Sequence, residues 1–241
     1  MSQEKARPQR GSSPPTRARQ ERILAYHATT REAWAQIQAD NRLKESDRHY
    51  DWLGRGVYFW QAGPARAWVW KVHQQLPKHL RATPDQVIVL EVELTWNPAE
   101  CVDLLDIYWY RYLLGRAESI ISFWSDSLGW DPDRIDRELQ RNAEIDTAQP
   151  HAFDCRLIDS LCEDLFDLYG LEVRAVRGAF QHLARLYAHS AFRYGDHVQI
   201  AIRHPAMIDV ESVAIVEGLD EVEPWLPEGL LQVTPNTAKP L

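Results

Sequence analysis

The sequence predicts an α+β fold in which the strands pair mainly antiparallel. Short runs rich in Val, Ile and aromatic residues are spread along the chain, whereas helical patterns gather in one central segment. Strands and helices therefore do not alternate as they would in a doubly wound parallel sheet. With 241 residues, 45% of them hydrophobic, the chain is long enough for one large domain that carries an insertion.

Three segments differ in composition. Residues 1–21 are rich in Arg, Gln, Ser and Pro and offer almost no apolar side chains to bury, so we expect a disordered basic arm. Residues 22–241 are expected to form a single domain. Within it, residues 99–170 carry leucines and tyrosines at helical spacing, and we interpret them as a helical insertion.

Charge is distributed unevenly along the chain. The net charge is −8, which argues against recruitment of nucleic acid by the surface as a whole. Residues 1–22 hold six basic and two acidic side chains, and residues 99–172 hold 17 acidic and six basic ones. This asymmetry indicates a basic arm and an acidic face, or simply two solvated surfaces.

The three cysteines have no metal-ligand spacing and cannot all pair with one another. We therefore expect reduced thiols in a cytoplasmic protein that has no metal and no structural disulfide. No apolar run reaches the length of a membrane span, so no membrane association is expected.

Individual elements follow from periodicity and from helix and turn signals. Helices are expected over 31–39, with Thr29 and Thr30 as the cap, and from Gly63-Pro64 towards Pro77. A break at Arg177-Gly178 is expected within one strand. The expected strands cover 23–27, 57–60, 86–94, 171–180, 197–202, 210–216 and 230–233.

The stretch Gly54-Arg55-Gly56-Val57-Tyr58-Phe59 is the most informative motif. Its glycines allow a close backbone approach, and the apolar residues after them favour a buried strand. Alternation places Tyr58 and Trp60 on one face of that strand. Upstream, Tyr26-His27-Ala28-Thr29 ends another apolar run, and downstream His197-Val198-Gln199-Ile200 opens a third.

In this order, the three motifs resemble those of the ADP-ribosyltransferase superfamily, specifically its His-Tyr-Glu branch of diphtheria-toxin-like and poly-ADP-ribose-polymerase-like enzymes. The first motif of that branch is Tyr-His-Gly-Thr/Ser, the second is Gly-x-Gly-Ile/Val-Tyr-Phe, and the third carries a Glu. Here the second motif matches fully, Ala28 replaces the usual Gly of the first, and Gln199 stands where Glu is usual. The resemblance extends in order from about Ile23 to Met207.

The resemblance implies two small antiparallel sheets that form a cleft for NAD, which is the substrate. It implies catalytic roles for His27, Tyr58 and Gln199. It also implies NAD contacts from Tyr26, His27, Ala28, Thr29, Gly54, Gly56 and Tyr58. His27 would hydrogen-bond ribose hydroxyls, backbone groups around Ala28 would hold the nicotinamide amide, and Tyr58 would stack on the nicotinamide ring. A structural histidine and a core tyrosine are the alternatives.

Gln199 keeps an acceptor oxygen but lacks the charge that stabilises an oxocarbenium-like ribose. Three interpretations remain open: hydrogen bonding alone suffices, a nearby acid such as Glu172 or Glu211 substitutes, or the domain binds without reacting. Extension of poly-ADP-ribose is not expected without the Glu. Arg177 and the loop after it are candidate contacts to the acceptor of the ADP-ribosyl group.

We therefore expect a mono-ADP-ribosyltransferase, of the kind used as bacterial toxins or antiphage effectors, that moves ADP-ribose from NAD to a protein or nucleic-acid acceptor. An inhibitory antitoxin protein would then be a partner. The alternatives are an NAD glycohydrolase and a non-catalytic module that binds NAD or ADP-ribose. A relative of RNA 2′-phosphotransferases should show more basic pocket residues than this sequence does.

Overall fold

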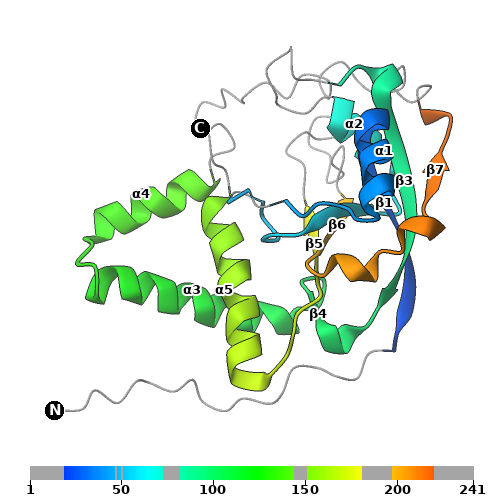
Figure 1. The fold of residues 1–241 in the computed structure, drawn as a ribbon. Coiled ribbons are helices and arrows are strands. Elements are labelled where there is room, and N and C mark those ends of the chain that lie inside the picture. Colours follow the sequence, from blue (N-terminus) through cyan, green and yellow to red (C-terminus); the bar gives the residue numbers. More distant parts are fainter. Residues whose placement is uncertain are drawn as a thin grey trace, which may run out of the picture.

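The computed structural model describes residues 19–46, 48–49, 51–72, 82–143, 151–180 and 197–219. The expected basic arm lies outside these residues except at 19–21, and the expected strand 230–233 lies outside them entirely. Residues 181–196, which precede the third motif, are also outside the described part. Figure 1 shows a sheet at one side of the molecule and helices reaching away from it at the other.

The sheet contains seven strands among the described residues, and it confirms the α+β class with mostly antiparallel pairing. The strand order is β4-β5-β6-β2-β1-β3-β7, and the only parallel pair in this sheet is β4–β5. The strands are β1 (Glu21–Thr30), β2 (Val57–Gln61), β3 (Val87–Trp96), β4 (Cys101–Asp103), β5 (Ala175–Phe180), β6 (His197–Ile202) and β7 (Ala214–Val216).

The two separate sheets that the resemblance implies are here one hydrogen-bonded sheet with a narrow joint. Strands β1 and β3 pair over all ten residues of β1, whereas β1 and β2 pair only at Ala25–Gln61 and Tyr26–Trp60. Beyond Tyr26, the edge of β1 that faces β2 has no ladder partner among the described strands. The sheet therefore opens between β1 and β2, next to His27.

Helices cover both faces of the sheet. Five α-helices are described: α1 (Arg31–Asp40), α2 (Pro64–Val72), α3 (Tyr108–Asp126), α4 (Pro132–Ala143) and α5 (Ala152–Tyr169). One face packs Phe59, Ile200 and Leu90 against Trp34 of α1. The other face packs against α2 at β1 and β3, and against α3 and α5 at β4, β5 and β6.

Local signals account for most element boundaries. The hydroxyl of Thr30 accepts a hydrogen bond from the Ala33 amide (3.2 Å), so Thr30 is the cap of α1. The strand expected over 171–180 begins at Ala175 and continues through Arg177 and Gly178 without a break. The strand expected over 210–216 is a 3-10 turn over Val210–Ser212 followed by β7.

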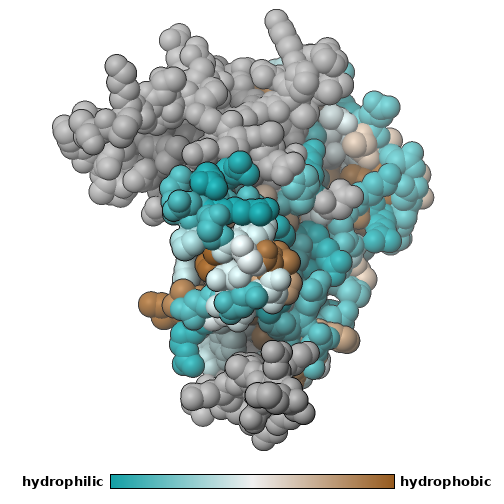
Figure 2. All heavy atoms as spheres, turned by 90° about the vertical axis from the view of Figure 1, so that its left-hand side faces the viewer, coloured by the Kyte–Doolittle hydropathy of each residue, from teal (hydrophilic) through white to brown (hydrophobic). Residues whose placement is uncertain are grey.

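The segment expected to be a helical insertion starts with strand β4, and its helices begin only at Tyr108. Figure 1 shows α3 and α4 as a hairpin that projects away from the sheet, with α5 between the hairpin and the sheet. Figure 2 looks onto this end, where apolar patches interrupt a polar surface. Exposed apolar side chains on α3 and in the turn after it include Phe123 and Leu128.

Candidate functional site

The three motifs lie on neighbouring strands, because β6, β2 and β1 are adjacent in the sheet. Trp60 of β2 is the register partner of both Tyr26 on β1 and Gln199 on β6, and Gln199 is also paired with Gly178 on β5. Since directly opposed residues share a face, the side chains of these positions lie in one row across the sheet. The three motifs are separated in the sequence but lie next to one another in the sheet.

His27 lies at the opening between β1 and β2. Its Nδ1 is 2.9 Å from the Tyr58 carbonyl oxygen, and its ring centroid is 5.5 Å from that of Phe59. A carbonyl can only accept, so Nδ1 carries the proton. Burial lowers the pKa of His27, with the Lys71 charge acting in the same direction and the Tyr58 hydrogen bond opposing both. The ring is therefore neutral at pH 7, and Nε2 is an acceptor without a hydrogen-bond partner among the described residues.

The other residues of the first motif are packed against the body of the protein. Tyr26 and Ala28 are buried on the face covered by α2, and Thr29 is 5% exposed. Burial raises the pKa of Tyr26, and the neighbouring Glu91 carboxylate raises it further. The backbone edge of β1 at Ala28 has no partner on the β2 side among the described strands, and the expected amide clamp at that position remains a prediction.

Tyr58 stabilises the loop that carries Gly54 and Gly56, the glycine loop. Its hydroxyl donates to the Gly54 carbonyl oxygen (2.8 Å) and accepts from the Leu53 amide (2.9 Å). The ring packs against the cluster formed by the sheet with α3 and α5, and burial raises its pKa. The hydroxyl is therefore committed to the loop, and only the ring is left for contact with a ligand.

The two glycines of the second motif are required by contacts within the protein. Gly54 has a φ of +76°, and a Cβ there would lie 2.5 Å from Asp159 Oδ1 of α5. A Cβ at Gly56 would lie 2.8 Å from the Ile202 carbonyl oxygen of β6. The glycines therefore allow the loop to approach α5 and β6, which explains them without any ligand.

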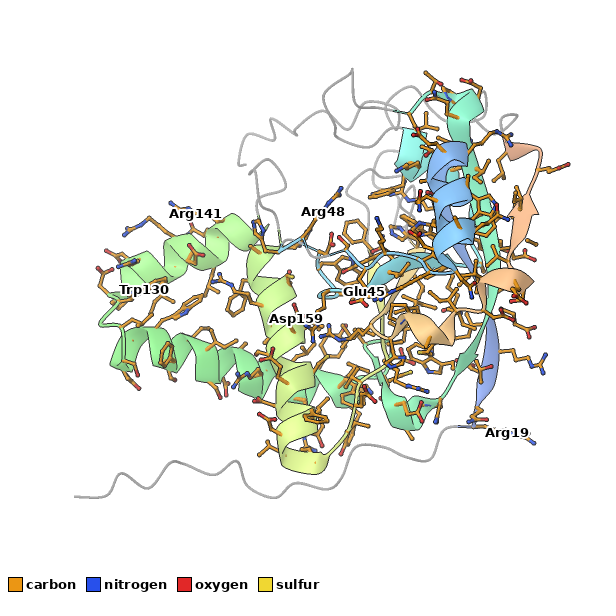
Figure 3. The ribbon with its side chains drawn as sticks, viewed as in Figure 1. Arg19, Glu45, Arg48, Trp130, Arg141 and Asp159 are labelled. Atoms are coloured by element: carbon orange, nitrogen blue, oxygen red, sulfur yellow. The ribbon has the colours of Figure 1, made fainter. Side chains whose placement is uncertain are left out.

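An ion pair holds the loop in this position. Arg203 Nη1 is 2.6 Å from Asp159 Oδ1 and 3.3 Å from the Arg55 carbonyl oxygen, while the Arg55 amide donates to Asp159 (3.1 Å). The Arg203 side chain is 5% exposed and that of Asp159 is 30% exposed. Figure 3 shows Asp159 on the side of α5 that faces the sheet. The insertion thus fastens the second motif through α5.

Gln199 is 8% exposed, and both ends of its amide are used. The indole Nε1 of Trp52 donates to Gln199 Oε1 (2.7 Å), and Gln199 Nε2 is 2.8 Å from His197 Nε2. An indole N–H can only donate, so the carbonyl end must face Trp52 and the NH₂ end must face His197. The second amide N–H has no acceptor among the described residues.

Aromatic side chains surround this amide. Trp52 lies against Gly178, where a Cβ would be 2.8 Å from its Cη2 atom, and edge-on to Phe180 (5.7 Å). The His197 ring is 5.1 Å from Phe180 and 6.5 Å from Trp60. Trp60 is 2% exposed, and its indole Nε1 has no hydrogen-bond partner among the described residues.

Strand alternation divides the predicted catalytic residues between two faces. Tyr58 and Gln199 lie on the face of Trp60, whereas His27 sits with Phe59 at the opening between β1 and β2. The structure therefore brings His27 to the Tyr58 backbone rather than to its ring. Sequence reasoning missed Trp52 and His197 as partners of Gln199, and the only signal for Trp60 was its alternation with Tyr58.

Two cavities lie away from these residues. The larger, about 580 Å³, is at the ends of β3, β4 and β5. It is lined by Arg19, Gln20, Glu21, Trp96, Pro98, Cys101, Asp103, Asp106, Trp109 and Arg177. The smaller, about 240 Å³, includes Thr95 and Arg174. His27, Tyr58 and Gln199 line neither, so we assign these cavities no role in the candidate site.

Arg177, a predicted acceptor contact, is a structural residue at this second location. It pairs with Asp103 through two nitrogens, lies 3.0 Å from Glu21 and stacks over the Trp96 ring. With its side chain only 11% exposed, its donors serve the junction of β1, β4 and β5.

The three cysteines are free and buried. In the described ranges, no group of three or more His, Cys, Asp or Glu residues is arranged to hold a metal ion. The helices of the same ranges are too short or too polar to cross a membrane. Comparison of the chain with protein-family models, curated proteins and solved structures finds no match in any of the three.

Proposed function

We propose that the chain is an NAD-dependent mono-ADP-ribosyltransferase that transfers ADP-ribose to a protein or nucleic-acid acceptor. The observation that supports this most is the neighbouring arrangement of the three motif strands, with the sheet open at His27. The neutral His27 ring presents the Nε2 acceptor that a ribose hydroxyl requires. The backbone groups of β1 beside it have no ladder partner on the β2 side within the described ranges, and a nicotinamide amide needs both a donor and an acceptor.

The reaction breaks the bond between nicotinamide and ribose and transfers the ribose C1 to the acceptor, with nicotinamide as the leaving group. In this proposal His27 orients the ribose, whereas the Tyr58 ring lies on the other face of β2 and is not assigned to the nicotinamide. The Lys71 charge, which is close enough to lower the pKa of His27, attracts the pyrophosphate of NAD. A toxin or antiphage role, with an antitoxin as inhibitor, belongs to the same proposal.

In this proposal Gln199 sets the rate of the reaction. A carboxylate 4 Å from the developing cation contributes roughly 4 kcal/mol at an effective dielectric of about 20, and a neutral amide supplies only part of that. Glu172 and Glu211 are exposed, and within the described ranges neither forms a hydrogen bond with Gln199. A mono-transferase of modest rate fits this site better than a polymerising enzyme.

A second candidate function, a non-catalytic module for NAD or ADP-ribose, is favoured by one observation. Gln199 is held by Trp52 and His197, so its amide serves the fold before any ligand binds. An NAD glycohydrolase, with water as the acceptor, would use the same residues as the transferase.

Labelled NAD distinguishes these functions when free nicotinamide, free ADP-ribose and labelled macromolecules are separated after incubation. The transferase predicts nicotinamide release together with macromolecular labelling. The glycohydrolase predicts release with free ADP-ribose alone, and the binding module predicts neither. Gln199→Ala should lower turnover strongly, because contacts made in the transition state act on rate.

Gln199→Glu is the informative substitution. It supplies the missing charge, so NAD hydrolysis should rise and transfer should fall if the acceptor requires a neutral residue. Because a carboxylate can only accept, it also requires a proton on His197 Nε2, which now faces an amide donor. Equal NAD turnover by wild type, Gln199→Ala and Gln199→Glu would contradict a role for this residue.

A further inference from the structure

Trp60 is a buried donor that the described part of the chain leaves unsatisfied. Its side chain is 2% exposed, and its indole Nε1 has no hydrogen-bond partner among the described residues. A buried N–H without an acceptor costs roughly 1–3 kcal/mol, so native structures usually satisfy such groups.

A second unsatisfied donor lies at the cross-strand position. Trp60 and Gln199 are register partners on β2 and β6, so their side chains leave the same face of the sheet. Trp52 fixes the Gln199 carbonyl oxygen and His197 takes one amide N–H, which leaves the other amide N–H without an acceptor in the described part of the chain. The His197 ring lies near both side chains.

We propose that Trp60 and Gln199 form a two-donor site for an uncharged oxygen of the ligand. The indole N–H and the free amide N–H both donate to that oxygen, and Trp52 and His197 hold the amide in the required orientation. The inference deepens the proposed function, on which it rests for the identity of the ligand. The site explains why residue 199 is an amide, because a carboxylate in its place could not donate a hydrogen bond.

The surroundings favour a neutral oxygen over an anion. In the described part of the chain, neither Trp60 nor Gln199 receives a hydrogen bond or a cation–π contact from an Arg or Lys side chain. The same row of side chains continues through Tyr26 to the Glu91 carboxylate, which disfavours an anion nearby. The rings of Trp70 and His197 next to Trp60 are both planar, with centroids 5.1 Å and 6.5 Å from that of the Trp60 ring. NAD has two kinds of matching oxygen, the carboxamide oxygen and the ribose hydroxyls.

Trp60→Phe tests the site, because it removes the N–H and keeps an aromatic ring. Trp68→Phe is the matched control, since Trp68 is also 2% exposed and packs in the same cluster from α2. Binding of nicotinamide, ADP-ribose and NAD is measured by calorimetry for both variants and for wild type. The unfolding midpoint of each free protein is measured in urea.

We expect Trp60→Phe to weaken binding of at least one probe about tenfold, the equivalent of one hydrogen bond. The free variant should unfold at a urea concentration no lower than that of Trp68→Phe, because both changes lose similar apolar burial and Trp60→Phe removes no hydrogen bond to a described residue. Trp68→Phe should leave affinity unchanged. A loss confined to nicotinamide and NAD identifies the carboxamide oxygen, and a loss confined to ADP-ribose and NAD identifies a ribose hydroxyl.

Three results would overturn the inference: unchanged affinity in Trp60→Phe, a lower unfolding midpoint than in the Trp68 control, or no binding of any probe by wild type. Failure of the proposed function is seen separately in the turnover of labelled NAD. Trp60-dependent binding without turnover rejects the transferase and keeps the site. Turnover with full affinity in Trp60→Phe rejects the site and keeps the transferase.

Discussion

The ion pair between Asp159 and Arg203 fastens the glycine loop, and its removal should loosen that loop. Asp159→Asn keeps the shape of the side chain but leaves the Arg203 guanidinium, 5% exposed, without its counter-charge. Breaking a fully buried pair from one side costs roughly 3–5 kcal/mol, and the 30% exposure of Asp159 reduces our expectation to about 2–3 kcal/mol.

A double-mutant cycle measures this coupling. Asp159→Asn, Arg203→Met and the double variant are unfolded in urea, and the interaction free energy is calculated from the four proteins. We expect the double variant to be more stable than Asp159→Asn, because Arg203→Met removes the uncompensated charge. Hydrogen exchange at the Arg55 amide, which donates to Asp159, should be faster in Asp159→Asn.

The reasoning would be refuted by additive effects of the two substitutions together with unchanged exchange at the Arg55 amide. Additivity would mean that the short contact between Asp159 and Arg203 contributes nothing measurable to stability. Unchanged exchange would mean that the loop keeps its position without α5. If only the coupling is found, the pair stabilises the fold but does not hold the motif.

Three further predictions concern other parts of the molecule. Gly178→Ala should displace the Trp52 indole, because the new Cβ would lie 2.8 Å from it, and chemical shifts of the Gln199 side-chain amide should change; an unchanged spectrum would contradict the bond between them. The folded-state pKa of His27 is lowered, so its contribution to stability is present above pH 6.5 and is lost as the pH falls towards that lower pKa. The urea midpoint of wild type should therefore fall more steeply below pH 6.5 than that of His27→Asn, and parallel curves would count against a buried neutral ring. The native thiols should react slowly with a thiol reagent at pH 8, because burial raises the pKa of each, and all three should react after denaturation; rapid native labelling would show an exposed thiolate. These pKa values are raised to about 12, 11 and 11 for Cys101, Cys155 and Cys162.

Local patterns were sufficient to predict the elements that carry the motifs. The strand expected over 197–202 has those bounds, and the helix expected over 31–39 is α1, which ends one residue later. Both follow from interactions within a few residues, such as the Thr30 cap and strand alternation. The expected strand over 210–216 was wrong in its first half, because Asp209 caps a 3-10 turn there by accepting from the Glu211 amide.

The contacts that define the candidate site could not be predicted, because they join distant parts of the chain. Gln199 receives its hydrogen bond from Trp52, which is 147 residues away in sequence. Residue 54 must be a glycine because Asp159 of α5 lies against it. No local sequence pattern indicates where α5 lies relative to this loop. Arg177 was assigned to an acceptor on its place in the sequence, whereas its ion pairs belong to another end of the sheet.

Incubation of the pure protein with labelled NAD and a cell extract tests the central claim most directly, with His27→Asn as the matched variant. Asn can still donate to the Tyr58 carbonyl oxygen, but it lacks the Nε2 acceptor of His27. The proposal predicts nicotinamide release with labelling of a protein or nucleic acid by wild type, and the loss of both in His27→Asn while the urea midpoint at pH 8 is kept. Absence of nicotinamide release by wild type, or equal release by His27→Asn, would contradict it.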